Sequence, residues 1–206
     1  TLASPVICPA SSVTLNVGNS GSAYLWSTGE TTQSVVIMQP GNYSVTVTDI
    51  HGCSASGQTT LQMSQLTGNT QYFTACNGTV TTLDAANSGC NFIWSNGATT
   101  QLLNITNTGT YTVTVTDSYG CTLSFSSQLL VNPKPVPAFA AGNVCINDTT
   151  SFTNSSTISG GNIISYQWDF GDGLTSVDIS PSHVYALAGK YIARLIAISD
   201  SGCIAD

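Results

Sequence analysis

Charged residues are scarce in this chain of 206 residues, and basic residues are almost absent. Only 6% of the residues are charged, and three Lys and Arg against ten Asp and Glu give a formal net charge of −7. A nucleic-acid partner needs clustered cations to neutralise phosphates, so DNA and RNA are excluded as expected partners. Anionic membrane surfaces are disfavoured for the same reason.

Long hydrophobic runs are also missing. No apolar segment approaches the roughly 20 residues that a membrane-spanning helix needs, so no membrane insertion is expected. The first residues lack the basic segment and apolar stretch of a secretory signal. Because the sequence starts at Thr1 without Met, we expect a processed or excised part of a longer protein.

Residues that carry catalysis are few. The chain has two histidines, and His51 lies in a turn where its repeat counterpart is Tyr119. No nucleophile, base and orienting group form a recognisable set, so we predict neither an enzyme nor a cofactor. Asp169 and Asp172 are weak candidates for a calcium site, since calcium requires several oxygens and two carboxylates supply too few. The favoured alternative is that both accept amide hydrogen bonds in a turn.

The residues that are abundant indicate β-structure and secretion. Thr, Ser, Asn, Gly and Val dominate, which favours strands and turns over helices. Seven cysteines are many for a cytosolic chain but ordinary for an extracellular one. They are Cys8, Cys53, Cys76, Cys90, Cys121, Cys145 and Cys203.

An internal repeat organises the chain. A shift of 68 residues aligns Cys8 with Cys76 and Cys53 with Cys121, and 22 of the 46 positions between these cysteines are identical without a gap. Two copies of one module are therefore present. The second copy has Cys90 where the first has Ser22.

A third unit follows a proline-rich segment and has the same order of motifs as the two repeats, from an opening cysteine to a closing Gly-Cys pair. Alternating prolines favour an extended connector rather than a strand inside a sheet. The predicted division is 1–68 for the first repeat, 69–132 for the second, 133–137 for the linker and 138–206 for the third module.

Alternation of apolar and hydroxylic residues predicts the strands. Residues 43–48 and 111–116 place apolar side chains on one face and hydroxyls on the other. We predict an all-β chain of tandem two-sheet sandwiches, each packed around a tryptophan. The expected core aromatics are Trp26, Tyr43, Trp94, Tyr111, Trp168, Phe170 and Tyr191. The expected contact face, for a glycan or ice surface, consists of Thr46, Thr48, Thr112, Thr114 and Thr116.

Sandwiches this small bury little apolar surface, so we expect disulfides to stabilise them. The repeat predicts one bond inside each module, between its opening and its closing cysteine: Cys8-Cys53, Cys76-Cys121 and Cys145-Cys203. Cys90 is then unpaired, either as an idle thiol or as an inter-chain bridge.

The third module resembles the polycystic-kidney-disease (PKD) domain. It contains Trp-Asp-Phe-Gly-Asp-Gly at 168–173, Pro-x-His-x-Tyr at 181–185 and Gly-x-Tyr at 189–191. The resemblance implies an immunoglobulin-like sandwich of seven strands, found in extracellular spacers, adhesion modules and accessory domains of secreted hydrolases. It also implies that His183 packs and forms hydrogen bonds within the sandwich, and that the last strand is missing from the chain.

The first two modules resemble immunoglobulin-like repeats of giant Bacteroidota surface proteins, including gliding-motility adhesins exported by type IX secretion. The shared motifs are Trp-Ser-x-Gly and Gly-x-Tyr-x-Val-Thr-Val-Thr-Asp-x-x-Gly-Cys. The leading hypothesis is a non-catalytic, extracellular stalk for cell adhesion at the cell surface. Its expected partners are other copies or modules of the same protein, a glycan, or a host or substrate surface. The alternatives are an extracellular filament built by strand donation or lateral packing, and an accessory region of a secreted hydrolase.

Overall fold

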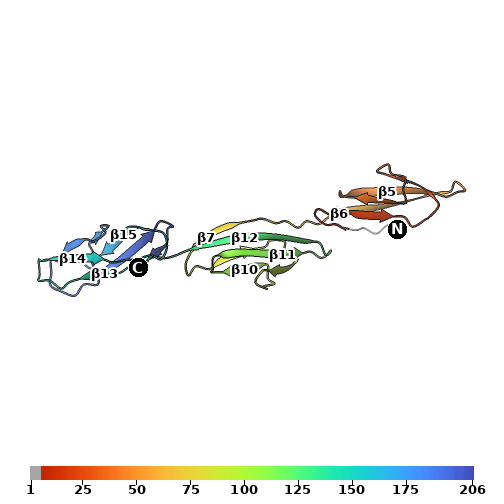
Figure 1. The fold of residues 1–206 in the computed structure, drawn as a ribbon. Coiled ribbons are helices and arrows are strands. Elements are labelled where there is room, and N and C mark those ends of the chain that lie inside the picture. Colours follow the sequence, from red (N-terminus) through yellow and green to blue (C-terminus); the bar gives the residue numbers. More distant parts are fainter. Residues whose placement is uncertain (1–5) are drawn as a thin grey trace. The chain divides into compact units, whose positions relative to one another are not determined.

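The computed structural model describes residues 6–206, and every regular element within them is a β-strand. Figure 1 shows the strands as arrows, without a helical ribbon along the described chain. The all-β prediction is confirmed. The described residues accordingly contain no helix with the length and hydropathy needed to cross a membrane.

The first repeat folds as two sheets. A four-stranded sheet has the order β1-β6-β5-β3, and β2 pairs with β4 in a second sheet. The pairs β3–β5, β5–β6 and β2–β4 are antiparallel, whereas β1 runs parallel to β6. The strands are β1 (Val6–Ile7), β2 (Val13–Asn16), β3 (Ala23–Trp26), β4 (Ser34–Ile37), β5 (Gly41–Thr48) and β6 (Ser54–Met63).

The second repeat has the same strand order, as its sequence identity to the first requires. Its sheets are β7-β12-β11-β9 and β10-β8, and β7 runs parallel to β12. The strands are β7 (Tyr72–Cys76), β8 (Thr81–Asp84), β9 (Asn91–Trp94), β10 (Leu102–Ile105), β11 (Gly109–Thr116) and β12 (Thr122–Asn132).

The third module pairs a three-stranded sheet, β13-β14-β17, with a four-stranded sheet, β16-β15-β18-β19. All of these pairings are antiparallel. The strands are β13 (Phe139–Ala141), β14 (Thr149–Asn154), β15 (Ile163–Asp169), β16 (Thr175–Ser176), β17 (Ser182–Val184), β18 (Arg194–Ser199) and β19 (Ile204–Ala205).

A buried tryptophan stands in the core of each module. Trp26, Trp94 and Trp168 are 2%, 3% and 1% exposed. Each indole N–H donates at 2.8 Å to a backbone carbonyl, so the polar atom of the ring is satisfied inside the core. The carbonyls belong to Thr32, Thr100 and Asp178.

The other predicted core aromatics divide into two groups. Phe170 is buried and packs against Phe152. Tyr43, Tyr111 and Tyr191 are half-buried. The hydroxyls of Tyr43 and Tyr191 each donate to the carbonyl four residues earlier, at 2.9 Å in both cases, which ties each tyrosine to the loop before it.

The chain divides into two compact units whose border does not follow the repeat borders. The first contains Thr1–Gln71, Thr82–Leu103 and Thr110–Ser127, and the second contains Tyr72–Thr81, Asn104–Gly109 and Gln128–Asp206. The border crosses β12, because the first half of this strand belongs with the first unit and the second half pairs with β7.

The opening and closing cysteines of the first repeat lie at opposite ends of the module. The opening cysteine of the first repeat follows β1, whose Ile7 lies beside Met63 at the end of β6, where the chain leaves the module. We call this the distal end. The closing cysteine, Cys53, lies in the turn between β5 and β6 at the opposite, proximal end.

Candidate functional site

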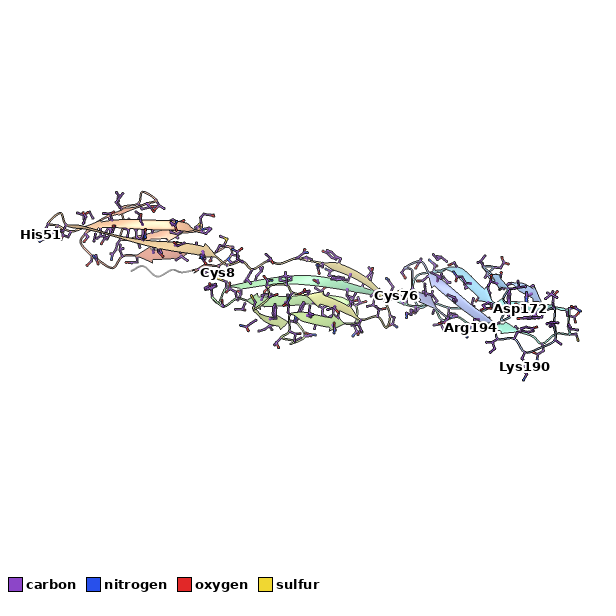
Figure 2. All side chains as sticks on the ribbon, turned by 180° about the vertical axis from the view of Figure 1, so that it is seen from behind. Cys8, His51, Cys76, Asp172, Lys190 and Arg194 are labelled. Atoms are coloured by element: carbon purple, nitrogen blue, oxygen red, sulfur yellow. A yellow bond between two sulfur atoms is a disulfide. The ribbon has the colours of Figure 1, made fainter. Side chains whose placement is uncertain are left out.

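The structure joins cysteines of neighbouring modules. Cys8 is bonded to Cys121 and Cys76 to Cys203, with Cα–Cα distances of 5.2 and 5.6 Å. Both bonds therefore link the opening cysteine of one module to the closing cysteine of the next. Figure 2 labels Cys8 and Cys76, the two opening cysteines that take part.

The predicted pairings Cys8-Cys53, Cys76-Cys121 and Cys145-Cys203 are corrected by this arrangement. Within the first repeat, the ten-residue strand β6 separates the proximal turn from the distal end. A strand rises about 3.3 Å per residue, which places Cys53 roughly 30 Å from Cys8. A disulfide tolerates a Cα–Cα distance of only about 4.4 to 6.8 Å, so a bond inside the module is geometrically excluded.

Three cysteines carry no disulfide within the described residues. Cys53 and Cys145 are exposed, and Cys90 is half-buried. Cys90 follows the positive-φ glycine of the loop before β9, and its N–H donates to the carbonyl of Asn87 at 3.2 Å.

A hydrogen bond across the first junction accompanies the disulfide. The Ser64 hydroxyl, just after β6, donates to the carboxylate of Asp117 at 2.7 Å, although 53 residues separate them. The other carboxylate oxygen of Asp117 accepts the N–H groups of Tyr119 and Cys121 at 2.9 Å. The Ser64 hydrogen bond, opposed by burial and assisted by these amides, lowers the pKa of Asp117 below its ordinary value of 3.8.

Removing the Ser64 hydroxyl should raise the pKa of Asp117. Because the folded-state pKa is depressed, the contribution of Asp117 to stability is present above pH 3.8 and is lost as the pH falls through the folded value. In Ser64→Ala, a carbon-detected NMR titration should find the pKa of Asp117 closer to 3.8. The exposed Ser54→Ala change should leave it unmoved, and an unchanged pKa in Ser64→Ala would contradict this account.

Aromatic packing and one ion-pair contact hold the histidine of the third module. His183 stacks on Phe170 at 4.3 Å between ring centroids and meets the edge of Tyr185 at 4.5 Å. Its Nε2 lies 2.7 Å from Asp172 Oδ2. Burial raises the pKa of Asp172, but the hydrogen bonds from His183 and the Leu174 amide outweigh it, so the pKa is lowered overall. His183 thus packs against two rings and binds a turn carboxylate.

The calcium candidates act as turn acceptors. Asp169 accepts the N–H of Gly171 at 2.9 Å, and Asp172 accepts the N–H of Leu174 at 3.1 Å. Among the described residues, no group of three or more His, Cys, Asp or Glu side chains could hold a metal ion. Asp169 and Asp172 therefore supply only part of the six to eight oxygens that calcium requires.

Several hydroxyls of the predicted contact face form hydrogen bonds within their own sheets. Thr48 pairs with Ser54 at 3.0 Å. In the second repeat, Thr112 and Thr114 each lie 2.8 Å from a serine hydroxyl of β12. Such cross-strand pairs stabilise the sheet and leave fewer hydroxyl groups for an external surface. The remaining predicted members are Thr46, which is exposed, and Thr116, which is half-buried.

The remaining histidine lies in a turn. Figure 2 shows His51 at the tip of the loop between β5 and β6. Its backbone N–H donates to Asp49 at 2.8 Å, which makes it part of the closing turn of the first repeat.

Comparison with known proteins identifies the third module. Residues 131–206 match the model of the PKD domain. A stretch of 42 residues is 52% identical to collagenase ColQ1 of Bacillus cereus and covers 20% of this chain and 4% of that protein. A stretch of 49 residues is 47% identical to the pre-pro-metalloprotease PrtV of Vibrio cholerae and covers 24% of this chain and 5% of PrtV.

Solved structures include the first PKD domain of the same Vibrio cholerae metalloprotease. That match has 38% identity and a TM-score of 0.33, and covers 35% of this chain and 86% of the other. The chain spans only a small fraction of the curated proteins it matches. A PKD domain is typically a non-catalytic accessory module. The C-terminal module of this chain, residues 131–206, is a PKD domain.

Proposed function

We propose that this chain is an extracellular, non-catalytic accessory region of a secreted hydrolase. The match of residues 131–206 to the PKD domain supports this most directly, because the similar curated proteins are collagenases and a metalloprotease. Two disulfides agree with an oxidising, extracellular compartment. In this role the modules space a catalytic domain from its polymeric protein substrate.

An antibody against this chain tests the proposal. Immunoprecipitation from culture supernatant should recover a protein that also degrades collagen or gelatin in a zymogram. The same immunoprecipitation is made in parallel from the solubilised cell fraction, and recovery of the protein only from that fraction, with neither substrate degraded, would contradict the accessory role.

A second candidate is the stalk of a surface adhesin, which the junction disulfides favour. Each bond joins consecutive modules, so pulling on the chain loads a covalent link in addition to the linker. The sequence resemblance to Bacteroidota surface repeats, including gliding-motility adhesins, agrees with this candidate. The same immunoprecipitation separates the two, because an adhesin remains with the cells and lacks the zymogram band.

A further inference from the structure

The two exposed cysteines occupy the same repeat positions as bonded ones. Cys53 is the closing cysteine of the first module and corresponds to Cys121 and Cys203, which are both bonded. Cys145 is the opening cysteine of the third module and corresponds to Cys8 and Cys76. One closing and one opening cysteine therefore remain without partners within the described chain.

The closing turn has the same backbone conformation in all three modules. In each, the residue four before the cysteine donates its N–H to the cysteine carbonyl, and the glycine before the cysteine donates back. The distances are 2.9 and 3.1 Å for Asp49–Cys53, 3.0 and 3.1 Å for Asp117–Cys121, and 2.9 and 2.9 Å for Ser199–Cys203. The glycine φ angles are +84° at Gly52, +83° at Gly120 and +77° at Gly202. The turn that ends at Cys53 thus has the same backbone hydrogen bonds as the turns of the bonded closing cysteines.

The opening turn is equally constant. In each module the cysteine carbonyl accepts the N–H of the residue three positions later. The distances are 3.1 Å for Cys8 and Ser11, 3.0 Å for Cys76 and Thr79, and 3.1 Å for Cys145 and Asp148. Cys145 therefore needs no refolding of its turn to form the bond that Cys8 and Cys76 form.

A groove of about 730 Å³, lined by both apolar and polar side chains, opens beside Cys145. It is lined by residues 142–146 and 187–193, among others. Ile146, Leu187 and Ile192 on its walls are 53%, 72% and 77% exposed, so the groove presents apolar side chains to solvent.

The corresponding end of the second repeat is covered by the next module. Asn107 stands two residues before the glycine of the Gly-x-Tyr motif, as Leu187 does in the third module. Asn107 lines a pocket that also contains Asn77, next to the opening cysteine Cys76, and Gly160 of the third module. This end is therefore where a following module docks.

We propose that the groove beside Cys145 binds the closing turn, Asp49–Cys53, of a second copy of this chain, and that Cys145 forms a disulfide with Cys53 of that copy. Copies then join head to tail by the contact that joins the modules within one chain. Such a contact uses different surfaces on the two copies, so it can repeat from one copy to the next.

The ion pair that Lys190 can form supports this occupant. The described hydrogen bonds to Asp49 reach only one carboxylate oxygen, from the N–H groups of His51 and Cys53. In Asp117 the second oxygen is the one that binds Ser64 across the junction. The groove is lined by one basic residue, Lys190, and one carboxylate, Asp148, so Lys190 is the group that offers a cation to the second oxygen of Asp49.

Oxidised glutathione supplies the oxidising equivalents. The Cys145 thiolate attacks its disulfide, forms a mixed disulfide and releases one glutathione thiolate. The Cys53 thiolate of the second copy then attacks the Cys145 sulfur and releases the second glutathione. Two protein thiols are oxidised to one disulfide, and one glutathione disulfide is reduced to two glutathiones.

Complementary variants test the link. Both carry Cys90→Ser, and one adds Cys53→Ser while the other adds Cys145→Ser. Mixed in a glutathione redox buffer, they should form a heterodimer about tenfold more abundant than either homodimer, equivalent to about 1.4 kcal/mol of preference. Mass spectrometry of unreduced digests should find Cys145 bonded to Cys53. Homodimers at statistical abundance, or no cross-link at any concentration, would overturn the proposal.

Groove variants separate docking from random oxidation. Leu187→Asp, added to the chain that keeps Cys145, should reduce heterodimer formation several-fold because it replaces an apolar residue of the groove wall by a second carboxylate beside Asp148. Val177→Asp changes a residue of the same module that is 76% exposed and does not line the groove, so it should have no effect. Equal yields from both variants would show that the thiols react without the groove, which also overturns the proposal.

Discussion

Replacing Cys76 and Cys203 together by serine should lower the free energy of unfolding of the second unit by about 4 to 5 kcal/mol. The bond spans 127 residues, and a cross-link of that span removes much of the entropy of the unfolded chain. Cys203 is fully buried, so the serine also places a hydroxyl where the disulfide excluded water. Both effects act in the same direction.

Urea unfolding, followed by tryptophan fluorescence and by calorimetry, measures this loss. Cys145→Ser is the matched control, because Cys145 is exposed and carries no disulfide; it should change stability by no more than about 0.5 kcal/mol. If the double serine variant unfolded at the same urea concentration as the parent chain, the Cys76–Cys203 bond would not stabilise the unit.

The sandwiches could be predicted because local patterns determine them. Alternation over residues 43–48 and 111–116 lies within β5 and β11, where Val45, Val113 and Val115 are buried. A tryptophan in a strand that ends in a Gly turn likewise predicts a core position, because the strand pattern and the turn residue are both visible in a few neighbouring residues. The alternation of apolar and polar residues and the choice of turn residues are properties of short segments, so a single sequence is enough to detect them.

The disulfide pattern could not be predicted in the same way, because it depends on which strands are neighbours. The repeat shows that each module begins and ends with a cysteine, but both intra-module and inter-module pairing agree with that order. The parallel pairing of β1 with β6 and of β7 with β12 decides the matter, since it places the opening cysteine at the distal end. Strand pairing over more than fifty residues is not encoded in a local pattern.

The junction contact between Ser64 and Asp117 was missed for the same reason. Asp117 precedes a Gly-Cys turn in the sequence, which predicts only a turn acceptor, and one of its oxygens does accept turn amides. The other oxygen binds a serine of the preceding module, 53 residues away. The 68-residue spacing relates only the first two modules, and at the second junction Asn132 and Ser199 stand where Ser64 and Asp117 stand at the first, so no repeated motif marks this contact in the sequence.

Replacing Trp168 by alanine should lower the free energy of unfolding of the second unit by about 3 to 5 kcal/mol, the usual range for removing a large buried aromatic side chain. The indole is 1% exposed and contacts Phe139 and Phe152 at centroid distances of 5.1 and 5.5 Å. Its N–H also donates to the carbonyl of Asp178, which would lose its partner. The expected loss exceeds that of a Leu or Val truncation, because both the apolar contacts and this hydrogen bond disappear.

The same urea titration measures the effect of Trp168→Ala through calorimetry and circular dichroism, since the mutation removes a fluorophore. Ile179→Ala is the matched control: Ile179 lies one residue beyond Asp178 and is 68% exposed, so its loss should change stability by no more than about 0.5 kcal/mol. Similar effects of the two changes would mean that the aromatic cluster does not hold the two sheets of the PKD domain together. A large loss for Trp168 alone would show that one residue from β15 anchors β13 and β14, the strands that carry Phe139 and Phe152.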